Sequence, residues 1–550
     1  MPQLNRIALA ALVILTLARF VLLSATELDP DEAYIALCAD RPAWHYADSG
    51  PLPPLISRVG MGIAGHGEFG HRLFAPLLAL GLTLAGFSLA AGIANSRAAN
   101  WMLVGLSLLP AMTIASTRLT VASCTATFWT VLIWALWRAL HTHRRRVVYW
   151  AAAGVAGACC VLCHPGNGLL ILITLGLLIL VPRWRTNLFS GGFLLALGLM
   201  IAGLIPLWVW DDGLRGLAQV RWGRALGVGL GADQLSIRAF FGFLWECSVA
   251  YTPLLGFGLV WMLVRDARGI AGSYGARYAV AFSVPALLAA LALALFRRPD
   301  PLLLLPAAVP LLARLAEAWP TVPITQRLKI GVRTTALAVA ALLSVLVSQT
   351  DLVRRSGMSW GFRDAPPEGR GRTYWSPWGA DPTSMQRGWR ELASVLAEAQ
   401  VQATNDLGET PLLIADSPEA AALLAFYLPV PSKPESDKVE GSVRPTLLIQ
   451  PVATPDPATS LLGWSRYDSG IASLGTKEPD EADQGATVTN QRGRHALFLV
   501  LGNADQPVPR EITDAFDRIE QTSEAQLIRG GEQLRTVRIF ACYDYHGLPL

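Results

Sequence analysis

Long apolar runs separated by short polar turns fill the chain up to about residue 350, and a mixed pattern follows. An apolar run of about 20 residues is long enough to cross a bilayer as a helix. The chain holds about eleven such runs, and we expect membrane-spanning helices at about 7–26, 73–94, 101–116, 122–140, 149–163, 168–181, 189–210, 240–264, 278–296, 301–318 and 331–350. The first run has no convincing cleavage site, so it predicts a retained span rather than a removed signal peptide.

The connections between these runs alternate in length and charge. The long polar segments are 27–72, 211–239 and everything after 350. The other connections are short and basic, with Arg97, Arg144, Arg145, Arg146, Arg183, Arg185, Arg265, Arg268, Arg277, Arg327, Lys329 and Arg333. Short basic loops face the cytoplasm, so the N-terminus is predicted to be cytoplasmic and the long segments to lie outside.

The pattern after residue 350 changes to short strands that alternate with helices. Apolar runs predict strands at Thr410–Ala415, Thr446–Gln450, Ala496–Leu501 and Val537–Cys542, and helices at 387–402, Ser417–Tyr427 and about 510–520. Residues 476–492 are polar and are expected to form a mobile loop. We therefore predict a polytopic α-helical membrane domain at 1–350 and a soluble, periplasmic α/β domain at 351–550.

Composition narrows the class of protein further. Of 550 residues, 52% are hydrophobic and 16% are charged, and the net charge is only +4. No basic block is large enough to indicate a nucleic-acid partner. The seven cysteines lie mostly in or beside apolar runs and form no disulfide framework.

Four carboxylates fall within six residues directly after the first apolar run, at Glu27, Asp29, Asp31 and Glu32. A carboxylate is costly in hydrocarbon, so this cluster is expected at the outer water face or in a wet cavity. A carboxylate there could take a proton from a hydroxyl group. The alternative is a solvated helix start, with Asp29 or Asp31 as N-cap, Pro30 in the first turn and Glu32 favoured by the helix dipole.

The rest of the first outer segment is too long for a turn. Residues 31–39 predict a short helix along the membrane surface, and a second amphipathic stretch covers about 55–64. Between them, three prolines in the stretch 48–54 exclude a regular helix.

This segment resembles a known family. Asp31-Glu32-Ala33-Tyr34, then Trp44, then Tyr46-Ala47-Asp48 before a proline-rich turn, then Glu68-Phe69-Gly70-His71-Arg72-Leu73, is similar to bacterial relatives of protein O-mannosyltransferases and to the aminoarabinose transferases that modify lipid A. Both are GT-C glycosyltransferases. Arg297-Arg298 before Leu302–Pro306, and the stretches Gly388–Ala393 and Ala425–Pro429, also resemble segments of that family.

The resemblance implies sugar transfer from a polyprenyl-phosphate donor at the outer membrane face, with Asp31 essential to catalysis. The chain also departs from the family pattern. Ser49-Gly50 replaces a histidine-proline or lysine-proline pair, and Thr120-Val121-Ala122-Ser123 lacks the aspartate of a Thr-Pro-Asp motif. His164-Pro165-Gly166-Asn167 stands where relatives carry a lysine.

The chemistry of this transfer needs a base and fixed cations. Asp31 is the candidate base, with Glu32 and Asp48 as orienting neighbours. A divalent metal on Asp31, Glu32 or Asp48 is an open alternative, because hard cations prefer carboxylate oxygens; no other cofactor is expected.

Arginines are the first candidates for the cations. Arg297 and Arg298 are candidate phosphate ligands, because the guanidinium fork matches phosphate oxygens. They could instead pair with Asp300 or reach lipid headgroups. Arg72 is a weaker candidate, and His164 could bind phosphate or simply cap its turn.

The leading hypothesis is an inner-membrane glycosyltransferase. Its partners would be a polyprenyl-phosphate sugar, a lipid, glycan or protein acceptor, and membrane lipids. A transporter or flippase for lipid-linked sugar is the first alternative, although no paired halves with matching broken helices are evident. A non-catalytic protein that only binds lipid-linked sugar is the second, because of the absent aspartate near Ala122.

Overall fold

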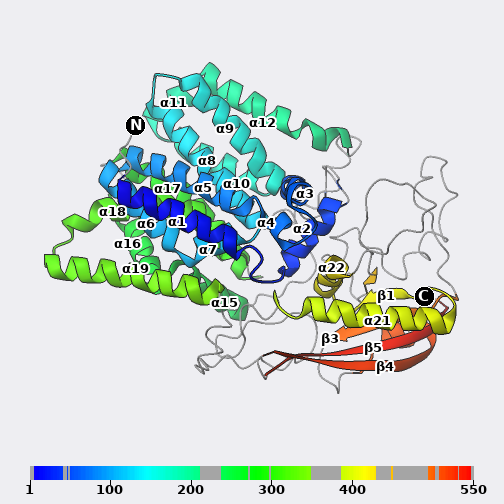
Figure 1. The fold of residues 1–550 in the computed structure, drawn as a ribbon. Helices are drawn as coiled ribbons and strands as arrows, with labels where there is room; N and C mark the ends of the chain where they lie inside the picture. The colour runs from blue at the N-terminus through cyan, green and yellow to red at the C-terminus, as the bar shows by residue number, and fades with distance from the viewer. Residues whose placement is uncertain are drawn as a thin grey trace. The chain divides into compact units, whose positions relative to one another are not determined.

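The computed structural model describes residues 5–40, 42, 46, 50–210, 237–269, 273–296, 299–348, 386–428, 448–449, 493–501, 507–529 and 532–546. Contacts within the chain divide it into two compact units (Figure 1). The first comprises Met1–Ala25 and Pro42–Val353, and the second comprises Thr26–Arg41 and Arg354–Leu550. The acidic segment therefore groups with the C-terminal residues rather than with the spans beside it in the sequence.

The first unit is helical throughout its described residues. Its elements are α1 (Arg6–Leu22), α3 (Leu52–Ala64), α4 (Glu68–Arg72), α5 (Ala75–Ile93), α6 (Ser96–Leu108), α7 (Pro110–Thr117), α8 (Val121–His141), α9 (Arg146–Cys163), α10 (Asn167–Ile179), α11 (Pro182–Leu188), α12 (Gly191–Trp210), α15 (Ile237–Tyr251), α16 (Pro253–Arg268), α17 (Tyr274–Ala294), η1 (Pro301–Leu304), α18 (Leu305–Ala318), η2 (Trp319–Thr321) and α19 (Gln326–Ser348).

Each predicted span falls on one of these helices or on two consecutive ones. Within the described ranges, five helices are long and apolar enough to cross a membrane, or up to eight if each bent pair forms one span. The chain is thus a membrane protein with several transmembrane helices. The predicted number of spans, about eleven, stays a prediction.

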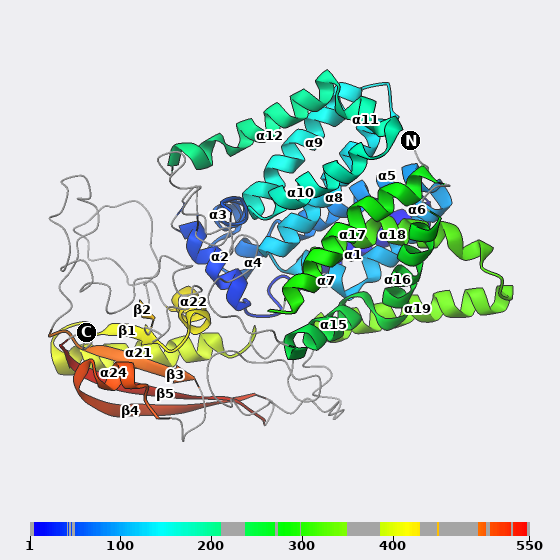
Figure 2. The same ribbon diagram turned by 180° about the vertical axis from the view of Figure 1, so that it is seen from behind.

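Helix α8 lies between α5 and α9 inside this unit, as both views show (Figures 1 and 2). Its Thr130 hydroxyl donates to the Ala126 carbonyl, and the Thr127 hydroxyl donates to the Ser123 carbonyl. Both side chains are buried, as are Trp129 and Trp137. Neighbouring helices rather than lipid surround α8, so it tolerates polar groups that bond to their own helix.

Two predicted spans are bent rather than straight. The expected helix over 101–116 breaks before Pro110, and α6 and α7 meet at 66°. Proline has no N–H and clashes with the preceding turn, so carbonyls just before it lose their helical partners. The Arg19 Nη2 group donates to the Ser107 carbonyl at 3.0 Å, and the Ser344 hydroxyl donates to the Leu108 carbonyl at 2.8 Å.

The prediction of one helix over 240–264 is wrong. Helices α15 and α16 meet at an angle of 103°. Thr252 between them has a φ of 57°, and its side chain accepts a hydrogen bond from the Leu255 N–H group. Pro253 follows at the start of α16, where its fixed φ suits a first helical turn. The apolar pattern runs through this corner, which explains why hydropathy alone did not show it.

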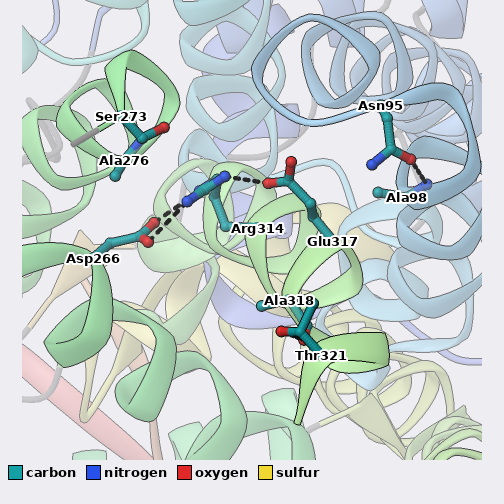
Figure 3. Close-up of polar contacts among 9 residues, drawn as sticks. All are labelled: Asn95, Ala98, Asp266, Ser273, Ala276, Arg314, Glu317, Ala318 and Thr321. Carbon is teal, nitrogen blue, oxygen red and sulfur yellow. Dashed lines mark hydrogen bonds and ion pairs between the residues drawn. The ribbon is translucent and has the colours of Figure 1, made fainter. Parts of the chain in front are cut away.

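A partly buried ion pair joins α16 to α18 (Figure 3). The Arg314 guanidinium donates to both carboxylate oxygens of Asp266, at 3.0 and 3.1 Å, and also contacts Glu317. Asp266 is only 3% exposed. Asn95 and Ser273 in the same view cap α6 and α17 by accepting from the Ala98 and Ala276 N–H groups.

The second unit combines a mixed sheet with helices. Its described elements are α2 (Pro30–Asp40), α21 (Trp389–Leu407), β1 (Leu412–Ala415), α22 (Pro418–Tyr427), β2 (Leu448–Ile449), β3 (Ala496–Leu501), α24 (Arg510–Thr513), β4 (Phe516–Arg529) and β5 (Glu532–Tyr545). The strand order is β2-β1-β3-β5-β4. β1 is parallel to β2 and β3, whereas β5 is antiparallel to β3 and β4.

One face of this sheet carries the apolar core of the unit. Ile414, Phe498, Phe540 and Tyr545 pack there with neighbouring residues, and Ile512 and Ala515 cover them from the α24 side. The predicted strands at β1, β2, β3 and β5 and the predicted helices at α21 and α22 are all present. The expected loop at 476–492 lies outside the described residues.

The prediction of a helix near 510–520 is mostly wrong. The helix α24 is only four residues long, and β4 begins at Phe516. β4 pairs with β5 along its whole length, from Phe516 opposite Tyr545 to Arg529 opposite Glu532. The polar composition of 517–526 resembles a surface helix, but pairing with a strongly apolar strand decides the conformation.

Candidate functional site

Helix α2 begins with a cap that two of the acidic residues build. The Asp29 N–H group donates to Glu32 Oε2 at 3.1 Å, and the Asp31 N–H group donates to Asp29 Oδ1 at 3.4 Å. Pro30 occupies the first helical position, and the Ala33 N–H group donates to the Asp29 carbonyl. Asp29 is thus the N-cap with Glu32 as its reciprocal partner, which is the structural role considered for them from the sequence. Asp31 takes no part through its carboxylate in these bonds and is exposed.

The C-terminal part of the second unit binds the residues just before this cap. Glu27 accepts from the Trp389 N–H group at 2.7 Å and from the Arg390 N–H group at 3.4 Å. The Leu28 N–H group donates to the Tyr427 hydroxyl oxygen at 2.7 Å. Helix α2 itself packs against α22. Local sequence could not reveal these bonds, because the partners lie about 360 to 400 residues apart.

Arg72 belongs to the first unit and is nearly completely buried. Its Nη1 group donates to the Leu23 carbonyl at 2.9 Å, just beyond the end of α1. Next to it in the sequence, the His71 Nδ1 atom lies 2.8 Å from the Ser57 Oγ atom, and both side chains are fully buried. Arg72 therefore holds α1 to α4 in this structure, and a role toward phosphate stays a prediction.

A serine–histidine pair of this kind was not predicted. Ser57 and His71 lie on different helices, α3 and α4, which approach closely because Gly60 and Gly70 lack side chains. A Cβ atom added at Gly60 would lie 2.3 Å from the Gly70 carbonyl oxygen. The paired glycines are the sequence signal that could have placed these helices in contact.

His164 ends α9 in a compact turn. The Gly166 N–H group donates to its Nδ1 atom at 3.1 Å, which is the capping role considered for it from the sequence. The preceding residue, Cys163, accepts through its carbonyl from the Gly50 N–H group at 3.0 Å. A Cβ atom at position 50 would lie 1.7 Å from the Leu162 carbonyl oxygen. The glycine that departs from the family pattern is thus required by this close approach, which brings the proline-rich turn to His164.

The stretch Thr120–Ser123, which lacks the aspartate of the Thr-Pro-Asp motif, lies at the start of α8. The Ser123 N–H group donates to the Thr120 hydroxyl at 3.1 Å, and the Thr120 N–H group donates to the Ser123 hydroxyl at 2.9 Å. This reciprocal pair caps α8. In this chain the stretch therefore serves as a neutral helix cap.

The remaining predicted site residues, Asp48, Arg297 and Arg298, lie outside the described residues. Asp31 and Glu32 share one helix of the second unit, whereas Arg72 and His164 are separate positions in the first. In the parts of the chain that the structure describes, no group of three or more His, Cys, Asp or Glu side chains is placed to hold a metal ion. A metal on Asp31, Glu32 or Asp48 stays an untested hypothesis.

Comparisons with known proteins agree with the resemblance read from the sequence. The family model for dolichyl-phosphate-mannose-protein mannosyltransferase matches residues 48–210. The structure is similar to ArnT from Cupriavidus metallidurans in the apo state, with a TM-score of 0.58 and 16% identity over 96% of this chain and 97% of that one. ArnT bound to undecaprenyl phosphate matches with a TM-score of 0.57 and 15% identity over 97% of both chains.

No curated protein sequence gives a match. The predicted resemblance to this family of GT-C glycosyltransferases is nevertheless confirmed by the family model and by the fold. At 15–16% identity, the similarity to ArnT establishes the fold of the chain and leaves its reaction to be argued from its residues.

Proposed function

We propose that this protein is an inner-membrane glycosyltransferase that moves a sugar from a polyprenyl-phosphate donor to an acceptor at the periplasmic face. The observation that carries the proposal is the end-to-end fold similarity to an ArnT structure that holds undecaprenyl phosphate. A single transmembrane helix or a shared subdomain would not give coverage of 97% on both chains.

The reaction divides the work between a base and cations. Cleavage between the anomeric carbon and the phosphate oxygen leaves a phosphate that is already a good leaving group, so cations that stabilise its charge are needed rather than a general acid. The acceptor hydroxyl must lose a proton as it attacks, and a carboxylate can take it. Asp31 suits this task because it is exposed, while its neighbours Asp29 and Glu32 are engaged in the cap of α2. Arg297 and Arg298, with Arg72, are the proposed phosphate ligands.

A transfer assay tests the proposal directly. The purified protein would be incubated with a panel of undecaprenyl-phosphate sugars and a bacterial membrane-lipid extract, and products would be read by mass spectrometry. We expect a sugar-sized mass increase on an acceptor and release of undecaprenyl phosphate. Uptake of intact donor into sealed proteoliposomes without transfer would instead support the flippase alternative, and donor binding with neither outcome would support a non-catalytic binder.

The side of the membrane needs its own test, because the proposal requires residues 351–550 to be periplasmic. A reporter that is active only in the cytoplasm, fused after Leu550, should be silent, whereas the same reporter placed in the basic turn at Arg144 should be active. The reverse result would show that the chain is inserted in the opposite orientation and would move the acidic segment to the cytoplasm, whereas activity at both positions would show that the span count is wrong.

A further inference from the structure

The start of α21 lacks a cap of its own. Its N-cap residue is Gly388, which has a φ of 80° and no side chain that could accept the first free N–H groups of the helix. The Glu27 carboxylate takes that place, since its two oxygens accept from the Trp389 and Arg390 N–H groups. A carboxylate also interacts favourably with the positive end of a helix dipole. Glu27 thus caps a helix that begins 362 residues later in the chain.

Further bonds connect the same helix start to the candidate base. The Glu27 N–H group donates to the Gln386 carbonyl at 3.2 Å, and the Gln386 side-chain amide donates to Asp29 Oδ2 at 3.4 Å. The other Asp29 oxygen, Oδ1, accepts from the Asp31 N–H group. A continuous set of hydrogen bonds therefore runs from the start of α21 through Asp29 to the backbone of Asp31.

Tyr427 contributes a second attachment from the end of α22. Its hydroxyl accepts from the Leu28 N–H group at 2.7 Å, and α2 packs along α22 beyond that point. Two separate helix ends thus fix two consecutive residues, Glu27 and Leu28, immediately before the cap of α2. The backbone alone already connects Glu27 and Leu28 to α1 and α2. The bonds from α21 and α22 therefore restrict the position of these two residues further.

We infer that the C-terminal part of the second unit positions Asp31 for catalysis and that Glu27 is the positioning residue through which it does so. The inference rests on the proposed function, in which Asp31 is the base. Glu27 acts through the backbone and has no proposed contact with donor or acceptor. It fixes the backbone that presents Asp31, and a base displaced by about 1 Å can lose as much as 100-fold in rate.

The test begins with hydrogen exchange, which needs no substrate. Glu27→Ala should raise amide exchange in peptides that cover 26–41, and Tyr427→Phe should do so to a smaller extent. Glu391→Gln is the matched control, because it removes a carboxylate from the first turn of the same helix without breaking any bond to the segment. Equal exchange in Glu27→Ala and the wild type, or an equal rise in the control, would overturn the inference.

Kinetics then separate positioning from general stability. With the donor that gives transfer in the panel, Glu27→Ala should lower kcat about 10- to 100-fold and leave the KM for donor unchanged. Glu27→Gln keeps one accepting oxygen, so it should restore part of the loss. In single-turnover assays on an Asp31→Asn background, Glu27→Ala should add no further loss, because interacting residues are not additive.

The outcomes distinguish failure of this inference from failure of the proposed function on which it rests. If Asp31→Asn keeps normal turnover, the proposed base is wrong and the positioning role fails with it. If Asp31→Asn loses turnover but Glu27→Ala does not, only the inference is overturned. A loss that multiplies in the double variant would mean that Glu27 acts independently of Asp31, which also contradicts it.

Discussion

Acidic side chains in the two units have different partners. In the first unit, both oxygens of the buried Asp266 carboxylate accept from Arg314, so one charge neutralises another between α16 and α18. In the second, Glu27, Asp29 and Glu32 accept from backbone N–H groups and the Gln386 amide, and Asp31 remains exposed beside them. The Asp266–Arg314 pair thus joins two helices, whereas the bonds of Glu27, Asp29 and Glu32 order the segment that carries Asp31.

Replacement of Asp31 by asparagine should have the largest effect of any single change at these carboxylates. The variant keeps the size of the side chain but cannot take a proton. Transfer should fall about 10²- to 10⁴-fold, the usual contribution of a positioned base, with undecaprenyl phosphate binding and expression unchanged. Normal turnover in Asp31→Asn together with loss of turnover in Asp48→Asn would contradict this prediction, because the base would then be Asp48.

The variant Asp266→Ala should damage the fold instead. It would leave the Arg314 side chain, which is 15% exposed, with one carboxylate fewer, so the loss of stability should be smaller than the cost of about 3–5 kcal/mol for breaking a fully buried pair. We expect a clearly lower apparent melting temperature in detergent. The protein that remains folded at low temperature should keep its turnover per folded molecule. A variant that is stable but inactive would place Asp266 in the chemistry and erase the contrast.

Asp29→Ala tests the cap of α2 together with the bond from Gln386. It removes the oxygen that accepts from the Asp31 N–H group and should cost about 1 kcal/mol of local stability. Amide exchange in the first turn of α2 reports this loss directly. Transfer should fall by far less than in Asp31→Asn, and a loss of equal size would indicate that Asp29 itself contacts substrate.

Glu317→Gln should have the smallest effect. Glu317 lies three residues from Arg314 on the same helix and is about one-third exposed, so the pair is worth about 0.5 kcal/mol. The melting temperature should change little, because the hydrogen bonds from Arg314 to Asp266 should remain. A loss as large as that of Asp266→Ala would show that all three residues act as one buried network.

The sequence predicted the helices of the first unit well because lipid and packing both select apolar runs. It did not predict the corner at Thr252, since the residues on both sides of it are equally apolar. In the second unit it predicted β3 to the residue and missed β4, whose polar residues become a strand only by pairing with β5. Pairing between distant segments leaves little trace in local composition.

The sequence predicted where in the chain the candidate site lies, but not the contacts that its residues make. Crowded carboxylates after the first span pointed to Asp31, and the caps built by Asp29 and Glu32 follow from local spacing. The role of Glu27 depends on Trp389 and Arg390, and the Ser57–His71 pair depends on how two helices pack. Neither relationship has a fixed spacing that a single sequence could reveal.

The arginine on α1 has a consequence for how the chain is made. Arg19 donates to the Ser107 carbonyl, which the break before Pro110 leaves without its helical partner, and 88 residues separate the two. At about 5–20 residues per second, that acceptor emerges from the ribosome on the order of ten seconds after Arg19. An arginine within a lone span opposes insertion. Helix α1 therefore reaches its full stability in the membrane only after α6 and α7 have been synthesised and inserted. Nascent chains that end before Ser107 should insert α1 less completely than longer ones.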